Sequence, residues 1–436
     1  MHYSVAVIGG GILGTSIAYF LSGQARDPGS VALVEQELDI ARHTSSRNTG
    51  KVHAPFLYDP AKKKLFAKAA SLGFEMWEKF AQARGLPFKR DGVLEVATDE
   101  RGMDRLHKYM SWGEANGLAK DDLMLLDKAA VKKMEPSVQC EAAIYCGKDG
   151  SVDYGSFSRA LLQDLRSFGC AVLLGHCVTR IENNSKAGAY VISTRQGRKI
   201  EAEFIVNAAG GNAVDIAHSM SIAREYTDLH FRGEYWQAPE QYRDLTRLSV
   251  YSVPRHSEYP FLDPHWIVRA DGRREVGPNA VPVFGPYAYS LGRNIADMLP
   301  KIIESSATGA RKVFFDRQFL SLASTELKSS LSKTAMINRV REFLPALKPS
   351  AFTERGTAGI RSSVIDSEGK FVPDTLILKR DSSVHVLNYN SPGATGALPM
   401  AAKVAMQVIE AGVLATTSTG KALTMWDPAE IALRMS

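Results

Sequence analysis

Near the start of the chain lies the stretch Val5-Ala6-Val7-Ile8-Gly9-Gly10-Gly11-Ile12-Leu13-Gly14, which decides the fold. Four apolar residues predict a short strand buried on both faces, and glycines interrupt it before a helical pattern resumes at Ile12. The glycines fit G-x-G-x-x-G: Gly9 permits a tight turn, Gly11 lets the backbone approach a pyrophosphate, and Gly14 lets the helix lie close to the strand. The stretch therefore predicts the strand, turn and helix of a Rossmann-type dinucleotide site.

This strand and helix belong to a charge-free segment of twenty residues, Ser4 to Gly23, which is long enough for a membrane helix. The glycine interruption and the lack of Lys or Arg ahead of the segment argue against a signal peptide or membrane anchor. A second apolar run, Val31–Val34, ends in Glu35, about twenty residues beyond Gly14. A carboxylate there accepts hydrogen bonds from an adenosine ribose, so we expect a dinucleotide site and no transmembrane segment.

The composition is that of a soluble globular protein. The chain has 436 residues, of which 45% are apolar and 23% charged, and this length predicts two or three domains. The formal net charge of +6 falls short of that of a nucleic-acid-binding protein. The cysteines have neither a C-x-x-C pair nor zinc-ligand spacing, so we expect buried, reduced thiols, no metal site and a reducing, cytoplasmic compartment. They are Cys140, Cys146, Cys170 and Cys177.

Three further segments bear on which dinucleotide binds. After Glu35, residues 41–50 form a loop of hydroxyl, amide and cationic side chains that suits phosphates, although a solvated turn would have the same composition. An apolar strand enters small residues at 204–211, and a small-residue turn at 390–397 precedes a helical run that reaches Glu410. A helix that begins on such a turn directs free N–H groups at an electron-rich group, such as the pyrimidine edge of a reduced flavin.

Together these segments make the chain recognisable. It resembles the FAD-dependent oxidoreductases of the D-amino-acid-oxidase superfamily over nearly its whole length, and most closely the L-2-hydroxyglutarate dehydrogenase/oxidase family. The runs that carry the resemblance are Arg47–Ala54, Asp149–Tyr154, Asn207–Gly210, Phe231–Trp236, Pro260–His265, Val276–Val281 and Ser391–Thr395. The chain departs from the family at Pro55 and Asp263, where the family usually has glycine beside the expected substrate pocket.

The resemblance implies an α/β fold in which a Rossmann-type FAD-binding domain is interleaved with a mixed, mostly antiparallel β-sheet substrate domain. We expect the FAD-binding domain at 1–85, 150–220 and 350–436, and the substrate-binding domain at 86–149 and 221–349. The hydrophobic spacing agrees coarsely with this division. It predicts a helix over 156–168, strands over 171–206, antiparallel strands over 221–290 and helices over 295–342.

FAD is the cofactor that the resemblance implies, and the matching motifs define the residues expected to hold it. They comprise the glycine-rich turn, the acidic end of the second strand, the polar loop, and the small-residue turns. The expected cofactor-binding residues are Gly9, Gly11, Ile12, Gly14, Glu35, Thr44, Ser45, Arg47, Asn48, Thr49, Val178, Ala209, Gly210, Pro392, Gly393, Ala394, Thr395 and Gly396.

The implied reaction is oxidation of a small L-2-hydroxy acid, most closely L-2-hydroxyglutarate to 2-oxoglutarate, by hydride transfer to flavin N5. The hydroxyl proton needs a base, and histidine suits this role because its usual pKa lies near neutrality. We predict that His265 is the base and that His53 contacts flavin or substrate. For each of them, the alternative is a histidine that only shapes the pocket.

Substrate carboxylates call for arginine, because the planar guanidinium pairs with a carboxylate through two parallel hydrogen bonds. We predict that Arg232 and Arg361 bind them, and that Glu234 pairs with a nearby arginine. Arg255 and Arg269 are expected to be surface charges. The further substrate-binding residues expected are Tyr235, Asn279 and Thr395.

A quinone or an electron-transfer partner is the expected electron acceptor. The basic run Lys62–Lys64 opens a predicted helix and is expected to be a solvated face. Near the C-terminus, Asp427–Glu430 has the pattern of a helix start. The short helix that follows is expected to dock on the protein's own surface, with peripheral contact to an inner membrane as the alternative.

Other functions stay open on the sequence alone. Flavin amine and amino-acid oxidases use the same fold and motifs, and they would release ammonia and peroxide. A flavin-dependent RNA-modifying enzyme, or a dinucleotide-binding module without chemistry, is less favoured. Because the net charge is mild and the chain has no arginine-rich stripe, we expect no nucleic-acid partner.

Overall fold

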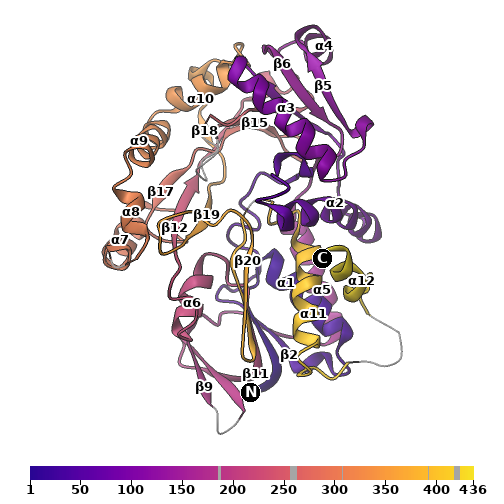
Figure 1. The fold of residues 1–436 in the computed structure, drawn as a ribbon, viewed down its shortest axis with the longest axis vertical. Coiled ribbons are helices and arrows are strands. Elements are labelled where there is room, and N and C mark those ends of the chain that lie inside the picture. Colours follow the sequence, from indigo (N-terminus) through magenta and orange to yellow (C-terminus); the bar gives the residue numbers. More distant parts are fainter. Residues whose placement is uncertain (185–187, 256–262, 307, 391, 417–422) are drawn as a thin grey trace.

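The computed structural model describes residues 1–436 except 185–187, 256–262, 307, 391 and 417–422. In Figure 1 a sheet with its helices occupies the lower part of the molecule, a second sheet lies in the upper part, and a row of helices forms the left edge. The short 3-10 turns are Pro28–Ser30, Pro55–Leu57, Lys120–Asp122, Gly210–Asn212, Glu240–Tyr242 and Pro349–Ala351.

The lower sheet contains the predicted dinucleotide strand at its centre. Strand β1 (His2–Ile8) pairs in parallel with β2 (Val31–Val34) on one side and with β11 (Lys199–Asn207) on the other. The strand order is β20-β21-β11-β1-β2-β8, and β9 and β10 extend the sheet from β11. The Rossmann-type prediction is confirmed. The remaining strands of this sheet are β8 (Ala171–Leu173), β9 (Val178–Asn184), β10 (Ala189–Thr194), β20 (Leu376–Arg380) and β21 (Ser383–Asn388).

Helix α1 (Ile12–Gln24) explains why the opening segment carries no charge. Every residue from Ile12 to Gly23 is buried, since α1 packs against the sheet, α5 (Tyr154–Phe168) and α11 (Ala397–Ile409) (Figure 1). A charge on any face of this helix would lie in apolar surroundings, where it costs several kcal/mol. Helix α2 (Lys64–Arg84) also packs against α11.

The upper sheet is mostly antiparallel, as predicted, with one parallel pair between β14 and β4. Its order is β18 (Glu354–Arg355), β13 (Trp236–Gln237), β16 (Arg274–Gly277), β15 (His265–Val268), β14 (Ser249–Ser252), β4 (Val93–Ala97), β6 (Ala142–Cys146) and β5 (Leu123–Asp127). A third, antiparallel sheet joins β17 (Val281–Val283), β12 (Thr227–Gly233) and β19 (Gly359–Ile365). A two-stranded ribbon pairs β3 (Lys51–Val52) with β7 (Gly150–Ser151).

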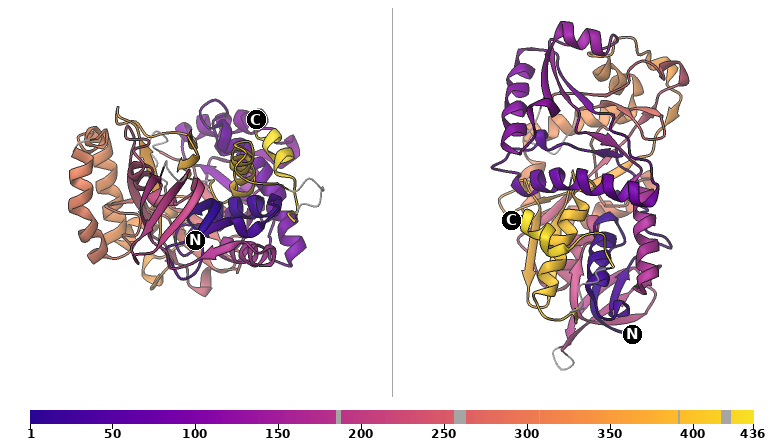
Figure 2. Two further views of the ribbon diagram at one scale, coloured as in Figure 1. Left: turned by 90° about the horizontal axis from the view of Figure 1, so that it is seen from below. Right: turned by 90° about the vertical axis from the view of Figure 1, so that its right-hand side faces the viewer.

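Helices cover the edges of these sheets. The predicted helical region contains α7 (Leu291–Ser306), α8 (Ala310–Phe314), α9 (Arg317–Leu331) and α10 (Lys333–Arg341), which form an outer row in Figures 1 and 2. The other helices are α3 (Glu100–Ala115), α4 (Lys128–Met134), α6 (Ala213–Ser219) and α12 (Pro428–Arg434). Within the described ranges, every helix is too short or too polar to cross a membrane.

The C-terminal helix docks on the protein itself, which was the favoured expectation. The Asp427 carboxylate caps α12 by accepting the N–H of Ala429 at 2.8 Å. Ile431 and Met435 are buried in the same apolar core as α1 and α11, whereas Leu433 is 77% exposed. The apolar side of this helix is therefore already covered by the chain.

Candidate active site

A cavity of about 1140 Å³ is lined by residues of all three larger sheets and their loops. It exceeds the roughly 300–1,000 Å³ of a usual small-molecule site, so it has room for a dinucleotide and a substrate. Many predicted site residues lie together in its wall. These are Gly11, Ile12, Thr44, Ser45, Arg47, Asn48, Thr49, His53, Gly210, Tyr235, His265, Asn279, Arg361, Pro392, Gly393, Ala394 and Thr395.

At one end of the cavity, the glycine-rich turn has the geometry that its motif predicts. Gly9 has a φ of +108°, and a Cβ on Gly14 would lie 1.9 Å from the Gly9 carbonyl oxygen. Gly11 precedes α1 without a side-chain cap, and the first turn of α1 contains no acidic residue. Ser45 crosses from the polar loop to accept the Ile12 N–H at 2.9 Å. The start of α1, with no side chain at Gly11 and no acidic residue in its first turn, is therefore suited to an anionic pyrophosphate.

Seven predicted residues lie outside the cavity wall. The carboxylate of Glu35 accepts the N–H of Gly10, in the glycine-rich turn, at 2.5 Å. Burial raises the pKa of Glu35. Val178 and Ala209 pack against an apolar cluster of the lower sheet. The others are Gly9, Gly14, Gly396 and Arg232. Gly9 and Gly14 serve the site indirectly, because they allow helix α1 to pack closely against strand β1.

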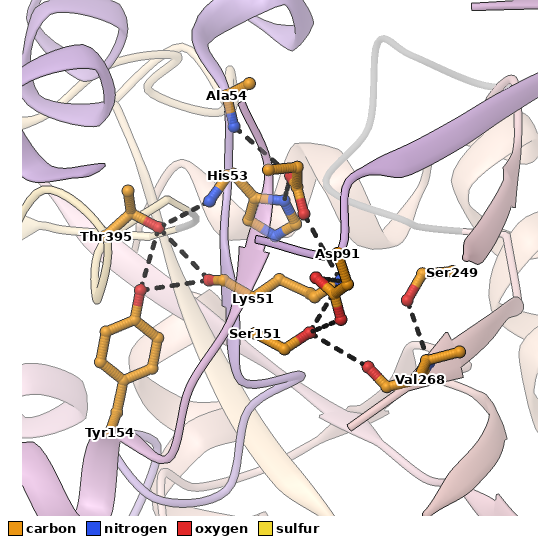
Figure 3. A network of polar contacts seen from close by, with 10 residues as sticks. Lys51, His53, Ala54, Asp91, Ser151, Tyr154, Ser249, Val268 and Thr395 are labelled. Atoms are coloured by element: carbon orange, nitrogen blue, oxygen red, sulfur yellow. Dashed lines mark hydrogen bonds and ion pairs between the residues drawn. The ribbon is translucent and has the colours of Figure 1, made fainter. Parts of the chain in front are cut away.

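At the other end, the small-residue turn is held against β3. The Thr395 hydroxyl accepts the His53 backbone N–H at 3.0 Å and lies 3.2 Å from the Tyr154 hydroxyl (Figure 3). The indole N–H of Trp77 donates to the carbonyl oxygens of Ala394 and Thr395, each at 3.0 Å. The turn opens α11, which has no acidic residue in its first turn. Ser391 of this turn lies outside the described residues, as do Pro260–Leu262 of another quoted run.

A buried ionic network lies directly behind His53. The Nδ1 atom of His53 is 3.4 Å from a carboxylate oxygen of Asp149. The Lys51 ammonium group, wholly buried, lies 3.6 Å from Asp149 and 3.1 Å from Asp91. Ser151 accepts a hydrogen bond from Lys51 at 2.9 Å and donates one to Asp91 at 2.6 Å (Figure 3). His53 thus has a carboxylate directly beside its ring, and this carboxylate is itself paired with Lys51.

His265 has a different environment, although it lines the same cavity. Its ring stacks on Tyr251, with centroids 4.1 Å apart, and burial lowers its pKa to about 3. His265 Nδ1 and the Tyr251 hydroxyl are both buried without a hydrogen-bond partner within the described part of the chain. Buried polar atoms usually have partners, so these two are available to a polar ligand. At neutral pH this histidine is uncharged.

Cationic side chains gather at the same cavity. Arg361, on β19, lines it, and burial lowers its pKa. The expected solvated face at Lys62–Lys64 is wrong at Lys63, which is partly buried in the cavity wall, whereas Lys62, at the same wall, and Lys64 are exposed. Burial, and then the nearby Arg361 guanidinium, lower the pKa of Lys63. A bound carboxylate would relieve this repulsion between like charges.

Three further arginines lie outside the cavity wall. Arg232 is held by Glu234, at 2.8 Å, and by the Ala288 carbonyl oxygen, at 3.0 Å, which confirms the expected pairing of Glu234. The expectation that Arg269 is a surface charge is wrong. Its guanidinium is 14% exposed, forms an ion pair with the buried Glu275 and donates to the Asn48 carbonyl. Arg255, 56% exposed, is a surface charge as expected.

Three cavity residues (Lys51, Tyr251 and Glu95) and the buried Asp149 behind them were not predicted from the sequence. Lys51 and Asp149 stand within runs quoted for the resemblance, but spacing alone does not show that they meet. Tyr251 and Glu95 occupy neighbouring strands, β14 and β4, in an alternating pattern that also fits a plain structural sheet. Glu95 lines the cavity, and burial followed by Asp149 raises its pKa well above the usual value. Tyr251 and Glu95 lie side by side only because strands β14 and β4 pair in the register that places these two residues opposite each other.

Comparisons with known proteins define the class. The family described as FAD dependent oxidoreductase matches residues 4–407, and the chain therefore belongs to this family. Two solved structures share the fold over nearly the whole length. They are L-α-glycerophosphate oxidase from Mycoplasma pneumoniae with FAD bound (TM-score 0.74, 22% identity, 97% of this chain and 98% of that one) and glycine oxidase from Geobacillus kaustophilus (0.65, 16%, 98% and 99%).

Curated relatives narrow the family. The chain is 30% identical over 407 residues to a protein named L-2-hydroxyglutarate dehydrogenase from Indibacter alkaliphilus, with 93% of this chain and 98% of the relative covered. It is 29% identical to the protein of that name from Escherichia coli K12, with 93% of each chain covered. The mitochondrial one from Homo sapiens is 28% identical, over 93% of this chain and 88% of the relative. The resemblance seen in the motifs is confirmed, and FAD is the cofactor.

Proposed function

We propose that this FAD-dependent oxidoreductase oxidises L-2-hydroxyglutarate to 2-oxoglutarate. The observation that carries the proposal is a dinucleotide-sized cavity that contains two histidines and the cations Arg361 and Lys63. Two cationic groups suit a dicarboxylate, because each can pair with one carboxylate. The names of the curated relatives support the same substrate.

In this proposal FAD is held by the glycine-rich start of α1, the loop 44–49 and the turn 392–396 at the start of α11. The predicted contacts of Glu35, Val178, Ala209 and Gly210 with FAD are part of the proposal. When bound, FAD supplies the acceptor for the hydride that leaves the α-carbon. The chain's own residues must then bind the carboxylates, orient the α-carbon and remove the hydroxyl proton.

We propose His53, and not His265, as the base that takes this proton. Asp149 lies 3.4 Å from Nδ1 of His53, so its carboxylate can orient the imidazole as the third group beside a catalytic base does. Lys51, which also pairs with Asp91, holds Asp149 in place behind the ring. Among the described residues, no carboxylate lies within ion-pair distance of His265, and its lowered pKa makes it a poor proton acceptor. We assign it, with Tyr251, to hydrogen bonding with the substrate.

The carboxylate contacts are proposed to come from Arg361 and Lys63, with Tyr235, Asn279 and Thr395 as hydrogen-bonding neighbours in the cavity wall. Arg232 is proposed to act through Glu234, whose backbone N–H donates to the Asn279 side-chain oxygen at 2.8 Å. It is therefore a positioning residue in this scheme and makes no substrate contact.

The interleaved domain division is also a proposal. The lower sheet draws its strands from 2–34, 171–207 and 376–388, and the upper sheet draws most of its strands from 93–146 and 236–277, which supports the division. Strand β18 (Glu354–Arg355) also belongs to the upper sheet, although the predicted boundary places it in the FAD-binding domain. A cytoplasmic, reducing location is supported by the four cysteines, all free thiols in the described structure.

A quinone, or an electron-transfer partner, is proposed as the acceptor of the electrons that leave the reduced flavin.

An anaerobic substrate screen tests the function. We expect the flavin absorbance of the purified holoenzyme to bleach with L-2-hydroxyglutarate, and not with its D-enantiomer or with amino acids. Bleaching by amino acids together with ammonia release would instead identify an amine or amino-acid oxidase. If 2-hydroxy acids of every kind leave the flavin oxidised, the proposal fails.

The same assay distinguishes the two histidines. We expect His53→Asn to slow anaerobic flavin reduction by about 10²–10⁴-fold, the usual contribution of a general base. His265→Asn, which removes a hydrogen-bonding group, should slow it by roughly tenfold. A larger loss in H265N than in H53N would transfer the role of base to His265. Flavin content, measured for both variants, controls for loss of the cofactor.

A further inference from the structure

Glu95 is an acidic residue in the middle of a buried strand. It lies on β4, whose five residues, V-L-E-V-A, are all buried. Glutamate is almost never fully buried unless it is paired. Glu95 is 2% exposed, and no hydrogen bond or ion pair joins its carboxyl group to another described residue. Because the residue also forms part of the cavity wall, its partner is to be sought in what the cavity binds.

Glu95 belongs to a row of three polar side chains across the upper sheet. In the pair of β14 and β4 it lies opposite Tyr251, so the two side chains point to the same face. On the next strand, β15, the ring of His265 stacks on Tyr251. All three residues line the cavity, and within the described part of the chain the Tyr251 hydroxyl and His265 Nδ1 also lack partners. The row thus presents three polar groups without partners to one ligand.

Burial favours the protonated form of Glu95. Its pKa is raised well above the usual value, first by burial and then by the carboxylates of Asp149 and Asp263. A carboxylate that is buried without a cation is strongly disfavoured, so the group is a neutral acid instead. A protonated carboxyl group has one O–H donor. Glu95 therefore adds a hydrogen-bond donor to the cavity wall without adding a charge.

The other titratable groups around Glu95 are compatible with this state. Tyr109, on α3, is buried, and its pKa is raised first by burial and then by Glu95. Burial also raises the pKa of Tyr251 and lowers that of His265, so both are uncharged at neutral pH. The cations of α3 that line the cavity are the half-buried Arg105 and the exposed Lys108. At neutral pH the row of Glu95, Tyr251 and His265 therefore carries no charge.

We propose that the un-ionised carboxyl group of Glu95 donates a hydrogen bond to a carboxylate of the bound substrate. This role rests on the proposed function, because it takes the substrate to be an organic acid. Arg361 and Lys63 supply the positive charge that such a substrate needs, and the row on the upper sheet supplies hydrogen bonds. A substrate amine would require the opposite state, in which an ionised Glu95 accepts the protons of an ammonium group. The protonation of one side chain thus distinguishes a hydroxy acid from an amine.

Glu95→Leu separates this role from a structural one. A buried polar group without a partner destabilises the folded state, and a leucine would continue the apolar pattern of the strand. We therefore expect E95L to raise the Tm of the holoprotein. The KM for L-2-hydroxyglutarate should rise by about 10–100-fold, the value of one hydrogen bond to a charged group, with little change in kcat. An unchanged KM overturns the proposal, whatever the Tm.

Glu95→Gln separates the hydrogen bond from the proton, because glutamine keeps a donor and cannot ionise. As the pH rises through the pKa of Glu95, the wild type gains a negative charge beside the bound carboxylate, and E95Q does not. We expect the ratio of the Kd of the wild type to that of E95Q to rise by about tenfold per pH unit above that pKa. Glutarate is the probe, and the shift of the flavin spectrum reports its binding without turnover. The ratio cancels the titration of Lys63, which both proteins share.

Glu135 provides the matched control. It is also 2% exposed, but its carboxylate accepts the N–H groups of Arg247 and Leu248, each at 3.0 Å, outside the cavity wall. E135Q should keep the wild-type dependence of Kd on pH. If L-2-hydroxyglutarate reduces the flavin of the wild type and the ratio of Kd values stays constant up to about pH 10, this proposal alone fails. If amino acids reduce the flavin of the wild type and not that of E95Q, the proposed function fails with it.

Discussion

Two histidines of one cavity show how the surroundings of a residue determine its chemistry. The Nδ1 of His53 lies 3.4 Å from the Asp149 carboxylate, and its backbone N–H donates to the Thr395 hydroxyl, so the ring is held beside a carboxylate. His265 is stacked on Tyr251 in a buried strand, where a charge is poorly solvated. The sequence predicts that histidines serve in this site, but it does not distinguish the roles of the two.

The buried, neutral state of His265 has a consequence for stability. Because its pKa is about 3 in the folded protein and about 6.5 in the unfolded chain, the unfolded state binds more protons below pH 6.5. The contribution to stability is therefore complete above that pH and is lost as the pH falls. Between about pH 6.5 and about pH 5, the loss is about 2 kcal/mol.

This loss can be measured with His265→Gln. We expect the free energy of unfolding of the wild type to fall more steeply than that of H265Q over this pH interval, as measured by urea denaturation of the holoprotein. His2, which is exposed, supplies the control, and H2Q should keep the wild-type slope. Equal slopes for H265Q and the wild type would contradict the assignment.

Lys63 and Lys64 are adjacent in the sequence but differ in location. Lys63 lines the cavity near Arg361, whereas Lys64 is exposed at the start of α2. We expect Lys63→Met to raise the KM for L-2-hydroxyglutarate by about 10–100-fold, the value of one charge-assisted hydrogen bond, with little change in kcat. Steady-state kinetics checks this, and K64M should keep the wild-type KM. An unchanged KM in K63M would remove the lysine from substrate binding.

At the scale of elements, the contact between β1 and α1 decides whether the cofactor site exists. A Cβ on Gly14 would lie 1.9 Å from the Gly9 carbonyl oxygen, and backbone atoms cannot yield as a flexible side chain does. The helix would have to move away from the strand, and its N-terminus would move with it. The uncharged sequence of α1 follows from the same close packing.

Gly14→Ala should therefore reduce both FAD content and stability. We expect a loss of about 1–3 kcal/mol from overpacking, together with a lower ratio of flavin to protein absorbance. Thermal unfolding and the flavin spectrum measure the two effects. Gly147 is a suitable control, because a Cβ there meets only ordinary contacts near Tyr145, so G147A should match the wild type. A G14A protein with full flavin content would show that the helix can shift without harm.

Over the whole molecule, the upper and lower parts are joined by specific contacts beside the cavity. Arg269 follows β15 of the upper sheet, yet its guanidinium donates to the Asn48 carbonyl of the polar loop that lines the cavity. The same group neutralises the buried Glu275 and lies over the Tyr235 ring, 5.2 Å from its centroid. One side chain thus ties the loop expected to hold FAD to the opposite wall.

Arg269→Met should weaken both the fold and cofactor binding. Removing the guanidinium leaves the Glu275 carboxylate buried and unpaired, which costs about 3–5 kcal/mol. Denaturation and titration of the apoprotein with FAD are the measurements. Arg273 pairs with Asp271 on the exposed turn of the same hairpin, and R273M should cost under about 1 kcal/mol. The double variant R269M/E275Q should recover part of the stability and not the FAD affinity.

The sequence predicted local features well and long-range partners poorly. The β1 strand, the α1 helix, the helical region before residue 342 and the capped C-terminal helix were all foreseen, because hydrophobic period, glycines and caps act over a few residues. Arg269 was misjudged, and Lys63 with it, because exposure depends on what the rest of the chain places above a side chain. Most residues predicted from the glycine-rich turn, the loop 44–49 and the turn 392–396 do lie in the cavity wall.

By itself, the sequence determined the class of protein. A glycine-rich turn after an apolar strand, an acid after the next strand and a small-residue turn before the last long helix suffice for a dinucleotide fold, because each is a constraint on nearby backbone. Only the tertiary structure decided which histidine has a carboxylate behind it and which cations face the cavity. These depend on contacts between residues as far apart as His53 and Thr395, and burial and charge at such contacts follow from the packing of distant segments.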